Sequence, residues 1–178
     1  MNRFKTLNYE GAWIPFDGDR MRFRLSVESF LREALSDPAG VMKVGDQGPE
    51  WHGKVKLEGL SYSNTFSNNI GWGVVVFSHS HELGVDLEKT NRVLKKNYLA
   101  LAKRFFHATE YEQLKTETIF NGSAKFLELW MKKEAYSKLK RKHLMEFINV
   151  SVSNAHFEPL MKMRQGYRAV LAINAKVI

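Results

Sequence analysis

The spacing of apolar and polar residues predicts the secondary structure of the first third of the chain. From Arg20 to Ser36 apolar residues recur at helical spacing, and Asp37-Pro38 is typical of a helix end. We expect one or two short strands before this helix and a connecting loop after it, over residues 38–53. A strand is expected over residues 54–60, followed by a polar loop over residues 61–69.

The rest of the chain alternates between helix and strand patterns. Thr109 and Glu112 fit a capping box at the start of a helix. Asn121-Gly122 is expected to end that helix, and Ser123 is a candidate cap for the long helix that follows. The expected helices are residues 93–106, 109–120 and 123–141, and the expected strands are residues 71–77, 83–88, 147–153, 156–163 and 167–175. Helices followed by strands in both halves indicate an α+β fold and suggest a distant duplication.

Composition narrows the class of protein. The 178 residues, 44% of them hydrophobic, are enough for one compact domain or two small packed halves. The absence of cysteine excludes disulfides, thiolate metal sites and thiol nucleophiles. No apolar run reaches the length of a membrane helix, and residues 1–15 lack the apolar core of a secretory signal. We therefore expect a cytoplasmic protein with no membrane partner.

The charge balance points to an anionic partner. The chain carries 27 basic and 19 acidic residues, a formal net charge of +8. Nucleic acid, a phosphorylated ligand and an acidic protein would all fit this excess. The charge alone does not choose among them.

Two acidic motifs suggest a site for a hard cation. In the strand predicted to contain them, Asp86 and Glu88 share one face. In the long predicted helix, Trp130, Glu134 and Lys138 are spaced four residues apart and also share a face. Two carboxylates from a strand and one from a helix would suit Mg²⁺, which prefers oxygen ligands. Lysines beside such a cage would suit a phosphate-bearing substrate.

The order and spacing of three motifs resemble a known family. Gly-Val-Asp-Leu-Glu at residues 84–88 and Trp-Met-Lys-Lys-Glu-Ala-Tyr-Ser-Lys at residues 130–138 resemble the signature of the 4'-phosphopantetheinyl transferases. Between them, residues 104–111 resemble the Arg-Phe-Phe…Thr-Glu-Tyr segment of the Sfp-like branch. The resemblance implies a Mg²⁺-dependent enzyme that transfers 4'-phosphopantetheine from coenzyme A to a serine of an acyl or peptidyl carrier protein and releases 3',5'-ADP.

The resemblance also implies roles for single residues. The implied Mg²⁺ ligands are Asp86, Glu88 and Glu134. Lys133 and Lys138 correspond to lysines that hold the phosphates of coenzyme A, and Lys138 would also stabilise or protonate the leaving phosphate. Glu134, or Glu110 through a water molecule, would accept the proton of the serine.

Three segments depart from the family pattern. Lys54, in Gly-Lys-Val, stands where the family often has Gly-Lys-Pro, whose lysine reaches a coenzyme A phosphate. Tyr62 replaces a phosphate-contacting histidine; its hydroxyl can donate a hydrogen bond to phosphate but brings no positive charge. Residues 139–144 form a basic run in place of a glycine loop. This run is either an ordinary helix end or a docking surface for an acidic carrier protein.

By the same resemblance, the chain would consist of two similar α+β halves that form a pseudo-dimer, with an abbreviated N-terminal half. Residues 1–78 would bind coenzyme A, residues 79–178 would carry the metal-binding and helical motifs, and the site would lie between them. We expect a monomer that binds coenzyme A and an acidic carrier protein, but not nucleic acid. Two alternatives remain open: a Mg²⁺-dependent phosphoesterase or nuclease, and a non-catalytic nucleic-acid-binding module that uses residues 132–143.

Overall fold

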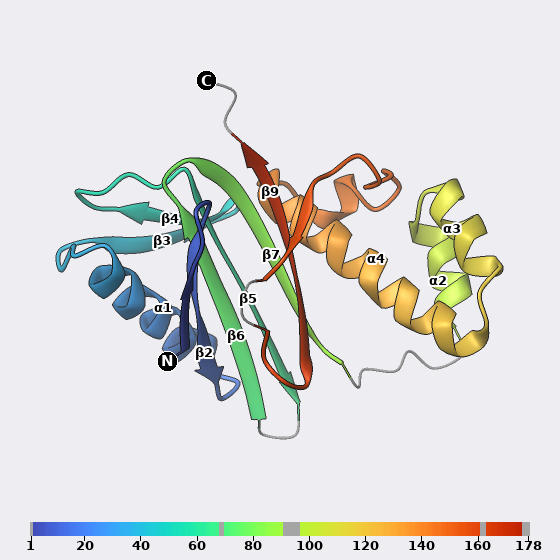
Figure 1. The fold of residues 1–178 in the computed structure, drawn as a ribbon, viewed down its shortest axis with the longest axis horizontal. Coiled ribbons are helices and arrows are strands. Elements are labelled where there is room, and N and C mark those ends of the chain that lie inside the picture. Colours follow the sequence, from blue (N-terminus) through green and yellow to red (C-terminus); the bar gives the residue numbers. More distant parts are fainter. Residues whose placement is uncertain (1, 68–69, 91–96, 161–162, 176–178) are drawn as a thin grey trace.

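The computed structural model of the chain describes residues 2–67, 70–90, 97–160 and 163–175. Two antiparallel sheets pack face to face around a shared apolar core. Helix α1 covers the outer face of the first sheet, and helix α4 covers the outer face of the second (Figure 1). This layered arrangement confirms the predicted α+β class.

The first sheet has the strand order β1-β2-β6-β5, with antiparallel neighbours. Its strands are β1 (Asn2–Lys5), β2 (Glu10–Phe16), β5 (Gly59–Ser67) and β6 (Ile70–Ser78). Alternation along β6 puts Val75 and Phe77 against α1, and Val74 and Val76 against the second sheet. Both faces of this strand are buried, which explains its unbroken apolar run.

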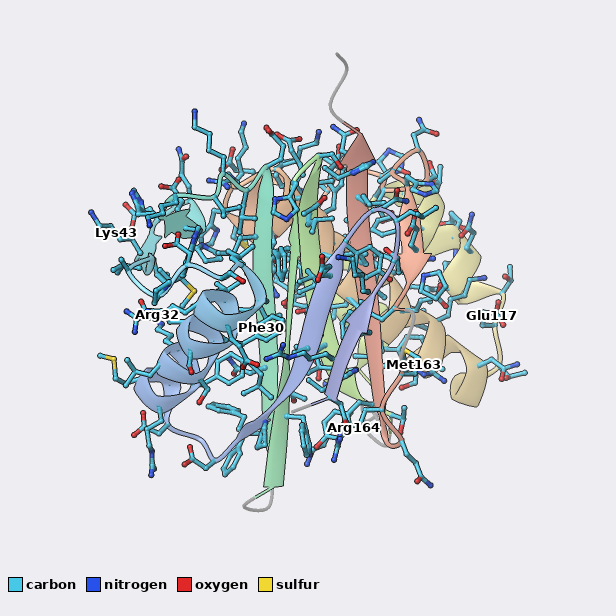
Figure 2. The ribbon with its side chains drawn as sticks, turned by 60° about the vertical axis from the view of Figure 1, so that its left-hand side comes forward. Phe30, Arg32, Lys43, Glu117, Met163 and Arg164 are labelled. Carbon is cyan, nitrogen blue, oxygen red and sulfur yellow. The ribbon has the colours of Figure 1, made fainter. Side chains whose placement is uncertain are left out.

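Helix α1 (Arg20–Ala34) follows the sequence pattern closely. The Asp19 carboxylate caps it by accepting a hydrogen bond from the backbone N–H of Met21 (2.8 Å). Its apolar stripe faces the sheet: Phe30 lies between helix and sheet, whereas Arg32 lies at the periphery (Figure 2). The predicted helix is confirmed, with an end slightly earlier than expected.

The segment predicted as a loop over residues 38–53 contains a hairpin of two short strands, β3 (Val41–Gly45) and β4 (Gly48–His52). Most of its residues are exposed or half-buried, as Lys43 is at the edge of the molecule (Figure 2). An exposed hairpin shows no apolar alternation, so the sequence pattern misses it. Trp51 anchors the hairpin against the core under α1.

The second sheet has the strand order β7-β9-β8, again antiparallel. Its strands are β7 (His81–Lys89), β8 (Phe157–Pro159) and β9 (Tyr167–Ala175), and β7 and β9 confirm two predicted strands. The strand expected over residues 147–153 is wrong, because Ile148 and Val152 are buried from turns and irregular backbone. The strand expected over residues 156–163 is reduced to β8, and residues 161–162 lie outside the described residues.

Strand β5 lies where the sequence pattern predicts a polar loop over residues 61–69, of which residues 68–69 lie outside the described residues. Of the strand expected over residues 54–60, only residues 59–60 are in a strand. Two buried serines of β5 form hydrogen bonds with the second sheet instead of with solvent. The Ser61 hydroxyl accepts from a backbone N–H of β7 (3.0 Å), and the Ser63 hydroxyl donates to Asp86 of β7 (3.0 Å). A strand that satisfies buried polar groups has no apolar alternation to reveal it.

Three helices form a separate cluster. Helices α2 (Tyr98–Phe105) and α3 (Ala108–Lys115) pack beside α4 (Ile119–Leu139) around an aromatic core (Figure 1). A 3₁₀ turn (Leu144–Glu146) follows α4. Residues 93–96 of the first predicted helix lie outside the described residues. Within the part that is described, no helix is long and apolar enough to cross a membrane.

The cap of α3 lies two residues before the predicted one. The ring nitrogen Nδ1 of His107 accepts from the backbone N–H of Thr109 (3.3 Å), and Glu110 Oε2 accepts from the backbone N–H of His107 (3.1 Å). This is a capping box with histidine in the role usually taken by serine or threonine. The predicted box starting at Thr109 is therefore wrong.

The start of α4 also differs from the prediction. Thr118, rather than Ser123, caps the helix. Gly122 lies inside α4 and does not end a helix. A Cβ at this position would overlap the Tyr98 hydroxyl of α2, so the absence of a side chain allows the two helices to approach closely. Here glycine marks a close contact between two helices and not a break in one.

A second close contact sets α4 on β7. A Cβ at Gly84 would overlap the carbonyl oxygen of Ala135 and the backbone of Leu139. Without a side chain at this position, α4 lies directly against β7, and Ala135 and Leu139 pack on Ala172 of β9. This contact brings the acidic motif of β7 to the acidic motif of α4.

Candidate active site

A pocket of about 610 Å³ lies where the start of α1, β5, β7 and α4 meet. The charged residues that line it are Arg20, Arg24, Asp86, Glu88, Glu134 and Lys138. The aromatic residues that line it are Phe16, Phe23, Tyr62 and Phe66. The two acidic motifs, far apart in sequence, thus share one cavity.

Asp86 is held firmly in the wall of this pocket. Asp86 is only 3% exposed to solvent. The carboxylate oxygen Oδ1 accepts from the hydroxyl of Ser63 (3.0 Å) and from the ammonium of Lys138 (2.8 Å). Lys138 Nζ also donates to the carbonyl oxygen of Val85 (2.9 Å). These bonds join β5, β7 and α4 at one point.

Glu134 extends from α4 beside Asp86. The indole N–H of Trp130, one helical turn earlier, donates to Glu134 Oε1 (2.6 Å). Burial raises the pKa of Glu134 to about 7; the negative charge of Asp86 adds to this rise, whereas Lys138 opposes it. The two carboxylates repel each other when both are ionised. Glu134 is therefore poised between its neutral and charged forms near neutral pH.

Glu88 is the third predicted metal ligand, and it also lines the pocket. Among the described residues, however, no three His, Cys, Asp or Glu side chains are gathered to hold a metal ion. Asp86 and Glu134 are close enough to interact directly. Mg²⁺ is commonly held by one or two carboxylates, with water and substrate phosphates as further ligands. The residues present fit such a two-carboxylate site better than a preformed cage of three.

Glu110 and Lys133 form a second acid–lysine pair, away from this pocket. Lys133 is completely buried, with its Nζ 2.8 Å from Glu110 Oε2 and donating to the carbonyl oxygen of Val150 (2.6 Å). Glu110 Oε1 accepts from the backbone N–H of Val152 (3.2 Å). Burial lowers the pKa of the Lys133 ammonium, and the ion pair with Glu110 opposes that lowering. The pair ties α3, α4 and residues 150–152 together.

Helix geometry separates the two pairs. Successive helical residues are turned by about 100°, so Lys133 and Glu134 cannot occupy the same face of α4. Within the described structure, neither Glu110 nor Lys133 borders the pocket. The catalytic role predicted for Glu110 and the phosphate contact predicted for Lys133 therefore lack the geometry that they require. We interpret this pair as structural.

The two predicted coenzyme A contacts of the first half are also separated. Tyr62 lines the pocket from β5, with its ring edge-on to that of Phe23 at a centroid distance of 5.7 Å. Lys54 follows β4, is exposed, and its backbone N–H donates to Asp37 Oδ2 (2.7 Å). In the part of the chain that is described, Lys54 is not among the residues that line the pocket.

The sequence motifs do not predict several polar residues of this pocket. Arg20 and Arg24 line it from α1, and Ser63 lines it from β5. The only signal for the arginines is a pair of basic residues one turn apart, which an ordinary solvated helix also shows. Ser63 was hidden because its segment has the composition of a loop.

Comparisons with known proteins bear on this site. Residues 82–169 match the model of the 4'-phosphopantetheinyl transferase superfamily. Over these residues, just under half of its length, the chain is similar to this superfamily. A 4'-phosphopantetheinyl transferase of Bacillus subtilis is 31% identical over 108 residues, which cover 61% of this chain and 45% of that protein. The 4'-phosphopantetheinyl transferase Sfp of Bacillus subtilis strain 168 is 31% identical over 93 residues, covering 52% of this chain and 40% of Sfp.

The match to the superfamily confirms the predicted resemblance, including its Sfp-like branch. A third relative, 4'-phosphopantetheinyl transferase psf-1 of Bacillus pumilus, is 40% identical over 60 residues. The alignments span less than half of the length of each of these curated relatives. None of these matches favours the phosphoesterase, nuclease or nucleic-acid-binding alternatives.

The superfamily match covers one wall of the pocket. Asp86, Glu134 and Lys138 lie within residues 82–169, whereas Arg20 and Tyr62 precede them. The acidic wall therefore carries the family signature. The part of the pocket formed by α1 and β5 lies outside the matched residues.

Proposed function

We propose that the protein transfers 4'-phosphopantetheine from coenzyme A to a serine hydroxyl of an acyl or peptidyl carrier protein and releases 3',5'-ADP. The serine Oγ forms a bond to the phosphorus that carries pantetheine, and the bond from that phosphorus to the oxygen of the nucleotide phosphate breaks. The serine proton passes to a base of the enzyme. The match to the superfamily and the names of the relatives support this activity.

The observation that carries the proposal is the meeting of Asp86, Glu134 and Lys138 in one pocket. Paired carboxylates attract a cation, and a lysine beside them attracts phosphate. A cavity with both features fits a diphosphate that is bound together with a metal ion. Such a ligand is the reacting part of coenzyme A.

We assign the metal contacts to Asp86 and Glu134, with Glu88 near enough along β7 to act through water. When bound, Mg²⁺ would neutralise charge on the diphosphate. Lys138, which lies beside Asp86, would stabilise the negative charge that develops on the departing nucleotide. Tyr62 would donate its hydroxyl hydrogen to a phosphate oxygen.

Glu134 is the proposed acceptor of the serine proton. A general base works best when its pKa lies near the working pH, because it must be both available and basic. In the metal-free protein, burial and the charge of Asp86 move the pKa of Glu134 to about 7, and a bound cation would lower this pKa. The hydrogen bond from Trp130 holds its other oxygen in place.

The two-halves organisation is part of the same proposal. Residues 1–78 and 79–178 would be the two halves of a pseudo-dimer acting as a monomer, with the site between them. In support, the pocket is lined by α1 and β5 from the first half and by β7 and α4 from the second. An acidic carrier protein would be drawn to the protein by its net charge of +8.

Mass spectrometry tests the activity. Purified protein is incubated with coenzyme A, Mg²⁺ and each of several apo-carrier proteins, and the carrier mass is measured. We expect a gain equal to one phosphopantetheine group, and no gain with a Ser→Ala carrier. Unchanged mass for every carrier, with a known transferase active in parallel, would contradict the proposal.

A further inference from the structure

A smaller cavity of about 220 Å³ adjoins the pocket on the far side of Tyr62 and Lys138. These two residues line both cavities. The smaller one lies between the turn of the β3–β4 hairpin, the start of β5 and the end of α4. The two cavities are therefore neighbours that share these two side chains.

The smaller cavity is predominantly cationic. Lys138, Arg141 and Lys142 line it together with one acidic residue, Asp46. Each of the three cations also pairs with a carboxylate that is not among the lining residues: Asp86, Glu50 and Glu146, respectively. Arg141 pairs with Glu50 of β4 (2.9 Å), but the two side chains are 37% and 49% exposed. Ion pairs this exposed contribute little to stability and exchange readily for another anion.

The backbone at Arg141 is unfavourable for an arginine. After α4, the N–H of Arg141 bonds to the carbonyl of Lys138 and the N–H of Lys142 to that of Ser137, the pattern of a Schellman motif. Arg141 occupies its left-handed position, with φ of 52°, where glycine is preferred and other residues are destabilising. Glycine would be more stable than arginine at this helix end, so helix termination does not account for the Arg141 side chain.

The geometry points to the smaller cavity as a subsite for a second, separate phosphate of the substrate, bound by Arg141 and Lys142 together with Lys138. This inference rests on the proposed function. Coenzyme A has such a group: a phosphate monoester on its ribose, in addition to the diphosphate. The cations at residues 141 and 142 would supply the positive charge that Tyr62, in place of histidine, does not bring.

A binding cycle tests the subsite. Coenzyme A and 3'-dephospho-coenzyme A, which lacks the monoester, are titrated against wild type and the Arg141→Gly/Lys142→Ala variant. We expect wild type to prefer coenzyme A by about tenfold or more, and the variant to lose most of that preference. Glycine adopts the left-handed conformation at position 141 without strain, so the melting temperature of the variant should not fall. Misfolding would then not explain a lost preference for coenzyme A.

Two control variants separate the possible causes. Lys140→Ala removes a neighbouring exposed lysine that does not line the cavity, and should leave the preference unchanged. Glu50→Gln removes the charge that pairs with Arg141 and should keep or increase the preference. A loss in Glu50→Gln equal to that in Arg141→Gly/Lys142→Ala would reduce Arg141 to a structural tether and overturn the subsite.

The outcomes also distinguish this inference from the proposed function. Equal binding of both ligands by wild type, or an intact preference in the double variant, overturns the subsite alone. If the double variant keeps the preference but raises KM for the carrier protein, residues 141 and 142 form a docking surface instead. Absence of any coenzyme A binding by wild type overturns the proposed function, and the subsite with it.

Discussion

Two acid–lysine pairs lie on different faces of α4, and they differ in how completely they are satisfied. Lys133 is completely buried, unlike Lys138, and the bonds of Lys133 and Glu110 reach α3, α4 and residues 150–152. Lys138 and Asp86 lie at a cavity, where Glu134 adds a second carboxylate that the single lysine does not fully balance. Complete satisfaction is typical of a structural pair, and an excess of like charge at a cavity is typical of a binding site.

The largest expected effect is on turnover. Asp86→Asn keeps the size and the acceptor oxygen of the side chain but removes its charge. We expect transfer to fall about 10³-fold or more, since cation binding and base positioning together account for several kcal/mol of the barrier. Transfer rate and melting temperature are measured on the same samples. A wild-type rate in this variant would show that Asp86 is not part of the reaction.

The same neutral substitution at Glu110 should act on stability instead. Glu110→Gln leaves the buried ammonium of Lys133 without its charge partner, and we expect a loss of about 3 kcal/mol in the free energy of unfolding. Denaturant unfolding monitors this loss, and Glu128→Gln on the exposed side of α4 is the control. If stability is unchanged while transfer is abolished, Glu110 has the catalytic role and not the structural one.

Glu134→Gln should have the opposite sign. The pKa of Glu134 is about 7 in the folded protein, above its ordinary 4.5, so the folded state binds more protons between these values and wild-type stability falls as pH rises through this window. In metal-free protein at pH 8, the glutamine variant should be more stable than wild type by about 1–2 kcal/mol. The gain should shrink as the pH falls and vanish below about pH 4, where the folded and the unfolded states are both protonated. Thermal melting at several pH values checks this, and a gain independent of pH would contradict the assignment.

The smallest effect concerns Tyr62, on the wall opposite the carboxylates. Tyr62→Phe removes one neutral hydrogen-bond donor, so coenzyme A binding should weaken by about 1.5–3 kcal/mol at most. Tyr62→His should be tolerated, and should bind more tightly at mildly acidic pH because the imidazolium adds positive charge. Titration of coenzyme A against the three proteins decides. Identical affinities would place the phosphates elsewhere.

The sequence predicted the parts of the fold that have regular apolar patterns. Helix α1 and strands β7 and β9 were found because each buries one continuous face. Strand β5 and the β3–β4 hairpin were missed, one because its polar residues bond to β7 and the other because it is exposed. Both belong to the first half, which holds the wall of the pocket that the superfamily match does not cover.

Motif spacing predicted one wall of the site, but it could not tell which lysine faces the cavity. Lys133 and Lys138 both match the motif, so the sequence does not show which of them faces the cavity. The packing of α4 against β7 at Gly84 places Lys138 beside Asp86 and Lys133 beside Glu110. Arg20 and Arg24 could not be predicted, because their approach to the pocket depends on the packing of α1 against the first sheet. Such long-range placement leaves no trace in local periodicity.

Calorimetric titration of Mg²⁺ tests most directly whether the pocket's carboxylates bind a cation. Wild type, Asp86→Asn and Glu128→Gln are each titrated in the presence of coenzyme A. We predict binding in wild type and in Glu128→Gln, and affinity at least about tenfold weaker in Asp86→Asn. Equal affinity in all three proteins, or no Mg²⁺ binding by wild type, would contradict the assignment of the cation to this pocket.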